Sequence, residues 1–309
     1  MIKDIVQEGP IELECLIARA EKGKTAKNTP YLSLALEDST GILDAKFWNL
    51  TEEMIAQYHA GMIVQAQGDI LFHKNSIQLR VRKLIPLEGK NVNDYVQNAP
   101  ISREKMEEEI METVLEIKNE TIQKIVLTIL EQKQEEFYSY PAATKNHHNF
   151  VGGLAYHTLS MLRMAKHTIK EYPWLDADLL YGGVVLHDIG KTEELSQSVL
   201  PEYTASGNLL GHISLMASYI DRIAYELHLE TSEEVLLLKH MVLSHHGKME
   251  FGSPVLPMIP EAEVLYLLDN LDARLDMMKT SIDQTKEGQF GPRVYALENR
   301  MIYRKKEKE

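Results

Sequence analysis

Histidines and aspartates recur at five places in the C-terminal half of the chain, each on or at the end of a stretch with helical apolar periodicity. The candidate metal ligands are His157, His187, Asp188, His212, His245, His246 and Asp269. Imidazole nitrogens together with carboxylate oxygens form a borderline-soft ligand set, which suits Mn, Fe, Co or Zn better than Ca. The residue types and their order therefore predict a transition-metal site built from several helices.

Phosphodiester hydrolysis is a reaction that such a site could perform. It requires a water made nucleophilic at neutral pH and a clamp on the phosphoryl oxygens, and two metal ions about 3.5–4 Å apart supply both. Asp188 follows His187 directly and precedes Gly190 by two residues, at the expected end of a helix. We therefore expect Asp188 to be the carboxylate that bridges two ions.

The order of these residues resembles that of the HD superfamily of metal-dependent phosphohydrolases over roughly residues 145–285. Residues 187–191, His-Asp-Ile-Gly-Lys, match the HDxGK form of that superfamily. A helical bundle with incidental histidines is the alternative, and the cost of burying unpaired imidazoles disfavours it. The resemblance implies one metal held by His157, His187, Asp188 and Asp269, and a second, bridged by Asp188, held by His212, His245 and His246.

Other residues have expected roles around this site. Asp269 and Asp272 share a helical face, and the D-x-x-D-A spacing favours Asp269 as the metal ligand. Asp272 is then expected to orient a ligand or a metal-bound water. Lys191 lies one turn from Asp188 and would stabilise charge on the transferring phosphoryl group, so these two are the expected catalytic residues. His148 could contact substrate phosphates at the mouth of the site, and a surface loop is an equal alternative for it.

The residues that precede this half of the chain predict strands. Apolar and polar residues alternate with period two in five segments, and Thr51 is the expected cap of a short helix between the third and fourth. Three strands, a helix and two strands follow the order of an OB-fold barrel. Residues 36–48 resemble the OB domains of the tRNA-anticodon-binding type. The five segments are residues 11–17, 31–37, 42–48, 62–72 and 76–84, and the helix is expected over 51–59.

From Ser102 onward the apolar period is helical, and we expect it to stay so to a frayed helix end at residues 304–309. The predicted fold class is a multidomain α+β protein, an N-terminal OB-fold β-barrel followed by an all-α HD domain. The predicted domains are residues 1–88 for the barrel, 89–145 for a linker and connecting helices, and 146–309 for the HD domain with its C-terminal helix.

Aromatic and basic residues of the predicted barrel could bind single-stranded nucleic acid. Tyr31 and Trp48 are available for base stacking, which is worth about 1–3 kcal/mol per base where it occurs. Arg80 and Arg82 lie on the polar face of the fifth strand. A solvated face is an equally good interpretation of these arginines.

Composition and charge narrow the class of protein. The 309 residues carry a net charge of −13, which disfavours tight non-specific binding of nucleic acid. Residues 1–90 are near neutral, with 11 Lys and Arg against 12 Asp and Glu, so the acidic excess lies in residues 91–309. The single cysteine, Cys15, points to a reducing compartment. No basic-then-apolar leader and no apolar run of about 20 residues occurs, so we expect a cytoplasmic protein with no membrane partner.

The combination of an OB domain and an HD domain resembles the YhaM-type 3′-5′ exoribonucleases of Gram-positive bacteria. Three motifs carry this resemblance, beginning at Gly152, at His245 and at Asp269. The resemblance implies degradation of single-stranded RNA, and also of single-stranded DNA, from the 3′ end to nucleoside 5′-monophosphates. It further implies a divalent metal, commonly Mn or Co. We expect two ions, with Mn favoured over Co, Fe or Zn, and a homo-oligomer.

Two other functions fit parts of the sequence. An HD-type nucleotidase or cyclic-nucleotide phosphodiesterase with a regulatory OB domain would hydrolyse free nucleotides without regard to oligonucleotide length. A non-catalytic single-strand-binding module with a structural metal would still bind after chelation and would release no products. The number of metal ligands disfavours the second of these.

Overall fold

The computed structural model describes residues 1–26, 28–73, 76–144 and 148–306. The chain divides into two compact units. One unit contains residues 1–98 together with residues 278–309, and the other contains residues 99–277. Each unit has its own hydrophobic core.

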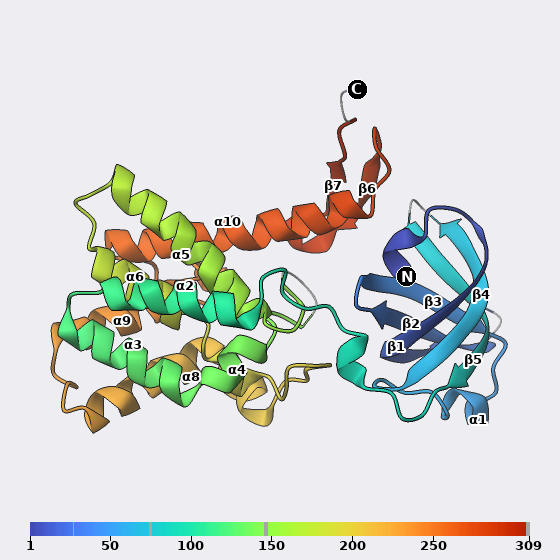
Figure 1. Ribbon diagram of the computed structural model, residues 1–309, viewed down its shortest axis with the longest axis horizontal. Coiled ribbons are helices and arrows are strands. Elements are labelled where there is room, and N and C mark those ends of the chain that lie inside the picture. Colours follow the sequence, from blue (N-terminus) through green and yellow to red (C-terminus); the bar gives the residue numbers. More distant parts are fainter. Residues whose placement is uncertain (27, 74–75, 145–147, 307–309) are drawn as a thin grey trace. The chain divides into compact units, whose positions relative to one another are not determined.

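The N-terminal residues form a closed five-stranded barrel (Figure 1). Its strands are β1 (Gly9–Lys24), β2 (Pro30–Asp38), β3 (Gly41–Trp48), β4 (Ile63–His73) and β5 (Ser76–Pro86). The strand order is β1-β2-β3-β5-β4, and every neighbouring pair is antiparallel except β3 with β5. The five strands close into a barrel, so the predicted OB-like barrel is confirmed.

Period-two alternation places one face of each strand in the barrel core. On β3, Leu43, Ala45 and Phe47 are buried, whereas Asp44 and Trp48 face outward. The helix between β3 and β4 is α1 (Glu52–Ile55), shorter than expected. Its N-cap is Thr51, as predicted, because the Thr51 hydroxyl accepts a hydrogen bond from the Met54 N–H.

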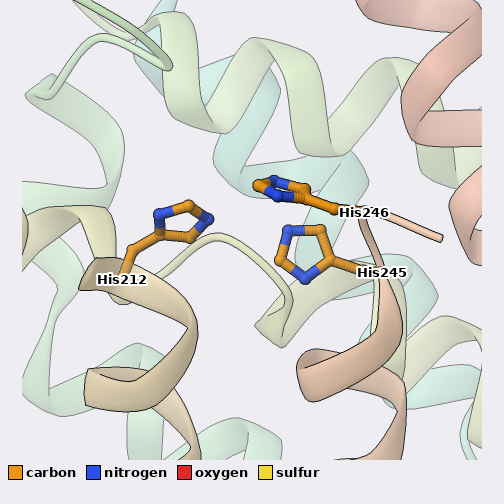
Figure 2. A group of neighbouring side chains, drawn as sticks. All are labelled: His212, His245 and His246. Carbon is orange, nitrogen blue, oxygen red and sulfur yellow. The ribbon is translucent and has the colours of Figure 1, made fainter. Parts of the chain in front are cut away.

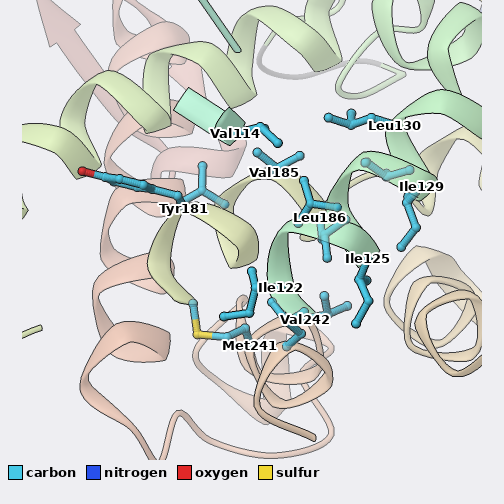
Figure 3. Close-up of a cluster of buried hydrophobic side chains, with 14 of the residues drawn as sticks. Val114, Ile122, Ile125, Ile129, Leu130, Tyr181, Val185, Leu186, Met241 and Val242 are labelled. Atoms are coloured by element: carbon cyan, nitrogen blue, oxygen red, sulfur yellow. The ribbon is translucent and has the colours of Figure 1, made fainter. Parts of the chain in front are cut away.

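The second unit is built from helices. These are α2 (Arg103–Glu116), α3 (Glu120–Gln132), α4 (Gln134–Ser139), α5 (Gly153–Glu171), α6 (Ala177–Leu186), α7 (Lys191–Glu194), α8 (Ala205–Glu226), α9 (Glu233–Ser244) and most of α10 (Pro260–Asp283). Residues 177–186 are nearly all apolar, so α6 is buried on all sides, with α3 and α9 packed on it. Figure 3 shows side chains of these helices, including Ile125, Val185 and Val242, in one cluster. A helical region after a barrel is the predicted α+β layout, which is confirmed.

The C-terminal segment differs from the predicted helix. Residues Phe290–Val294 (β6) and Arg300–Tyr303 (β7) form an antiparallel hairpin. Pro292 is incompatible with a helix interior, and Glu298 and Asn299 turn the chain with φ of 52° and 58°. The expected helix end at residues 304–309 is therefore wrong for the described residues 304–306, which follow a strand.

Short 3₁₀ turns complete the described elements at Ile2–Asp4, Val92–Asp94, Met249–Phe251 and Tyr295–Leu297. Among the described residues, no helix combines the length and the apolar character needed to cross a lipid bilayer.

The barrel contains a buried carboxyl group, Glu37, that makes its stability depend on pH. Burial raises the pKa of Glu37 from 4.5 to about 7, although the Gln97 N–H donates a hydrogen bond to its carboxylate. A raised folded-state pKa means that stability present below pH 4.5 is lost as pH rises toward 7, because the unfolded carboxyl ionises more readily.

We therefore expect Glu37→Gln, which keeps the hydrogen-bond acceptor, to stabilise the barrel at pH 8 but not at pH 4. The difference in the free energy of unfolding should reach roughly 3 kcal/mol. Denaturant unfolding followed by Trp48 fluorescence, with Trp174→Phe in both proteins, measures it. A difference that does not change between pH 4 and pH 8 would contradict the assignment.

Candidate metal centre

The motif His187-Asp188 stands at the C-terminal end of α6. The His187 Nδ1–H donates to the carbonyl oxygen of Val184, one turn earlier, at 2.7 Å. A Cβ atom at Gly190 would lie 2.2 Å from the carbonyl oxygen of His212, so only glycine lets this turn approach α8 so closely. The glycine of the HDxGK motif thus brings Asp188 next to His212.

His212 lies at an interruption of α8. Gly211 has φ 71° and ψ 155°, which breaks the helical path immediately before the histidine. One carboxylate oxygen of Glu194 accepts hydrogen bonds from the His212 backbone N–H (3.1 Å) and from its Nδ1 (3.2 Å). Sequence reasoning missed Glu194, because an acidic residue in the helix after HDxGK has no spacing signal that separates it from Glu193.

His245 and His246 follow the last residue of α9. Their Nδ1 atoms donate to the carbonyl oxygens of Val242 and Phe251, each at 2.7 Å. Figure 2 shows these two rings directed toward His212 across a small space. The three residues offer ligand atoms within 4.8 Å of one another.

A second group forms where α5 meets α10. His157, on α5, contacts Asp272 Oδ2 through Nδ1 (2.7 Å) and Asp269 Oδ1 through Nε2 (3.2 Å). His157, His187 and Asp269 again offer ligand atoms within 4.8 Å of one another. Burial lowers the pKa of His157, but its bonds to the two aspartates outweigh this and raise it to about 10, so a metal would displace a proton from this ring.

Asp188 lies between the two groups, with one oxygen toward each. Its Oδ2 is 3.4 Å from His187 Nε2 and 3.9 Å from His157 Nε2. Its Oδ1 is 3.4 Å from His212 Nε2 and 3.7 Å from His245 Nε2. This is the arrangement required of a bridging carboxylate.

The charges around Asp188 keep it ionised. Burial opposes ionisation, but the Lys191 ammonium at 2.6 Å and the adjacent His187 hold the pKa of Asp188 well below its ordinary value. Burial also opposes the charged form of Lys191, and Asp188 overcomes this and raises its pKa. Burial, with the neighbouring rings, lowers the pKa of His245 and His246, so both are neutral at pH 7.

The donor atoms fit a divalent transition metal. In His187, His245 and His246 the Nδ1 partner is a carbonyl, which only accepts, so Nδ1 carries a proton and Nε2 is the nitrogen left to bind a metal ion. Nε2 of His187, His212 and His245 and Oδ1 of Asp188 are buried and have no hydrogen-bond partner among the described residues. Each such atom costs about 1–3 kcal/mol when unsatisfied, and metal ions between them would remove that cost.

Two predicted residues, Asp272 and His148, lie behind His157 rather than beside Asp188. Asp272 accepts hydrogen bonds from His148 Nε2 and His157 Nδ1, both at 2.7 Å, so it fixes the orientation of the His157 ring. Its role behind a metal ligand stays a prediction. His148 is only 3% exposed, and its backbone N–H donates to Asp276. The structure therefore places His148 against Asp272, where the surrounding protein leaves little of it for a substrate to reach.

Four of the predicted nucleic-acid contacts, Tyr31, Trp48, Arg80 and Arg82, lie on the barrel. With Lys46, they make up a surface that we call the barrel face (Tyr31, Lys46, Trp48, Arg80 and Arg82). Tyr31 is opposite Trp48 across β2 and β3, with ring centroids 4.5 Å apart. Lys46 is paired with Arg80 across β3 and β5, and its Nζ lies 5.4 Å from the Tyr31 ring centroid. Arg82 contacts Asp69 at 3.2 Å, so part of its charge is already compensated.

Comparison with protein families matches residues 154–274 to the HD domain. This range contains every predicted ligand, and HD domains are metal-dependent phosphohydrolases that bind divalent metals. Among solved structures, the protein priB from Ralstonia solanacearum is similar over 25% of this chain and 97% of its own, with 12% identity and a TM-score of 0.23. The coarse prediction of a metal-dependent phosphohydrolase domain is confirmed, and the role of each individual ligand stays a prediction.

The contact between Glu194 and His212 predicts a selective effect on one of the two groups. Glu194→Ala removes the acceptor that orients the His212 ring, so we expect the second ion to bind about 10–100-fold more weakly. The group with His157, His187 and Asp269 should keep its affinity. Calorimetric titration with Mn²⁺ measures both steps.

Glu193→Ala is the matched control, because Glu193 is exposed and pairs with Lys133 instead. Equal weakening of both binding steps, or equal effects of the two substitutions, would contradict an orienting role for Glu194.

Proposed function

We propose that this protein is a metal-dependent 3′-5′ exoribonuclease that shortens single-stranded RNA to nucleoside 5′-monophosphates with two divalent ions, Mn²⁺ first among them. The observation that supports hydrolysis most directly is Asp188, whose two oxygens face two separate groups of histidines. Two adjacent metal ions can stabilise both the attacking and the leaving oxygen of a phosphodiester, and a carboxylate with one oxygen facing each ion could hold them together.

Metal ions in such a site supply a nucleophilic water at neutral pH and stabilise charge on the phosphoryl oxygens. The chain's own residues prepare the site. Lys191 keeps Asp188 ionised, and the carbonyls of Val184 and Val242 hold the two neighbouring imidazoles with Nε2 toward Asp188. In this proposal Lys191 also offsets part of the phosphoryl charge. Its ammonium group compensates the Asp188 carboxylate, so the phosphoryl oxygens are repelled less strongly.

The barrel face supports a single-stranded substrate. Tyr31 and Trp48 offer stacked aromatic surface, and Lys46 and Arg80 lie beside them at the spacing of neighbouring strands. Bases stack on aromatic rings irrespective of sequence, and basic side chains follow the phosphates. This combination favours an oligonucleotide over a free nucleotide as the substrate, with single-stranded DNA as a second substrate to test.

The charge distribution supports a weak grip on the substrate. The chain as a whole repels phosphate, and the near-neutral first 90 residues do not attract it strongly. Binding would then depend on stacking more than on counterion release, which suits an enzyme that must release and advance its substrate after each cleavage.

A nuclease assay tests the proposal. Metal-free protein is given Mn²⁺ and incubated with 5′-labelled single-stranded RNA, and in parallel with a free nucleotide and a cyclic nucleotide. We expect a ladder that shortens from the 3′ end, release of monophosphates, and a loss of at least 100-fold in Asp188→Ala, because its bridging carboxylate is gone. Intact RNA beside hydrolysed nucleotide would replace the proposal by a nucleotidase or cyclic-nucleotide phosphodiesterase, and no turnover of any substrate would leave a binding module.

The two tryptophans of the chain give a matched test of the barrel face. Trp48→Ala should weaken RNA binding by about 1–3 kcal/mol, because it removes one stacking surface. Trp174→Ala should leave binding unchanged, since Trp174 is 68% exposed and lies between α5 and α6. Fluorescence anisotropy with labelled oligoribonucleotides in the Asp188→Ala background measures both, and equal affinities of the two variants would remove the barrel face from the proposal.

A further inference from the structure

Helix α10 carries leucines on a side that its own fold leaves exposed. Leu267, Leu271 and Leu275 are 53%, 45% and 54% exposed, although Leu265 and Leu268 on the same helix are buried. The three leucines are four residues apart, so they form one row along the helix. We call this row the α10 stripe. Figure 1 shows α10 as the long helix near the C-terminal end of the chain.

The α10 stripe lies on a different side of the helix from Asp269. Asp269 is two residues from both Leu267 and Leu271, which places it about 200° around the helix from each. The same helix therefore offers carboxylates to the buried histidines on one side and leucines to the solvent on the other. Exposed leucines in a contiguous row are typical of a protein–protein contact.

Charged residues continue the row with opposite signs at its two ends. Glu263 precedes Leu267 by four residues and Lys279 follows Leu275 by four, and both are exposed. The row therefore reads Glu-Leu-Leu-Leu-Lys, with Leu271 at its centre. Lys279 also contacts Asp283 one turn later on the helix.

This pattern is complementary to itself in one orientation. In a two-fold contact, residue i of one copy faces residue j of the other, and j faces i. With the axis at Leu271, Leu267 would face Leu275 of the partner subunit. In the same register, Glu263 would face Lys279 of the partner subunit. A parallel arrangement would instead bring like charges together at both ends.

We propose that α10 pairs with α10 of a second copy of this chain, antiparallel and with Leu271 on the two-fold axis. Rows of residues four apart are the ridges that interlock in the commonest class of helix packing, so the leucines can interdigitate. A stable interface buries about 1,200–2,000 Å² in total, so the stripe is its apolar centre and surrounding residues form the rim. The inference stands independently of the proposed nuclease activity.

A cysteine scan tests the axis. Only a residue on the axis meets its own counterpart, so Leu271→Cys should form an interchain disulfide under mild oxidation. Leu267→Cys alone should not, whereas Leu267→Cys with Leu275→Cys should. The native background is low, because burial raises the pKa of the Cys15 thiol to about 12 and leaves it unreactive. Cross-linking of Leu267→Cys with itself as readily as Leu271→Cys would overturn the antiparallel pairing.

A charge exchange gives an independent test. Light scattering of the full chain after size-exclusion chromatography should show that Leu271→Glu or Glu263→Lys raises the dissociation constant at least tenfold. Glu263→Lys combined with Lys279→Glu should restore association, because the exchange preserves complementarity between the copies. Leu236→Glu, at a 64% exposed leucine of α9, is the matched control and should not change it.

Circular dichroism of each variant confirms the helical fold. A wild-type chain that stays monomeric at its highest soluble concentration, or an oligomer that tolerates Leu271→Glu, would overturn the proposal.

Discussion

A buried negative charge is the constraint on which the helical unit depends. The Asp188 side chain is 3% exposed, and an ionised carboxylate in such a place costs several kcal/mol unless other groups compensate it. Lys191 supplies the compensating charge from only three residues along the chain, which requires a tight turn at Gly190. The imidazoles of His157, His187, His212 and His245 surround the same carboxylate, so the surrounding helices must each bring a ring within reach of it. His157 does so from within α5.

The other three rings are brought to Asp188 at the ends or interruptions of helices. His187 follows α6, His245 follows α9, and His212 follows the break in α8 at Gly211. At such points the backbone carbonyls and turns provide fixed partners for one ring nitrogen, while the other nitrogen points to the centre. The apolar packing of α3, α6 and α9 then holds these ends in place, so the metal centre depends on the hydrophobic core beneath it.

The sequence predicts the barrel strands and the order of the candidate metal ligands because both signals are local. Alternation over β2 and β3 marks their inward residues, and residues 187–191 define the turn that brings Asp188 and Lys191 together. Glu194 and the burial of His148 could not be predicted, since each depends on a contact made by a distant helix. The C-terminal hairpin was not predicted, because the helical period was extended past Pro292. In addition, left-handed backbone angles at Glu298 and Asn299 set the turn, and no apolar pattern encodes them.

The hydrogen-bond partner of Nδ1 decides how easily a mutation can disturb the orientation of each histidine ring. His187 and His245 are fixed by carbonyls three residues earlier in their own helices, and no side-chain substitution can remove a carbonyl. His157 and His212 are fixed by the side chains of Asp272 and Glu194, which a single codon change can delete. As the sequence drifts in descendants of this chain, His157 and His212 would therefore lose their orientation first, one in each candidate metal group. His187 and His245, which main-chain carbonyls hold beside Asp188, would lose it last.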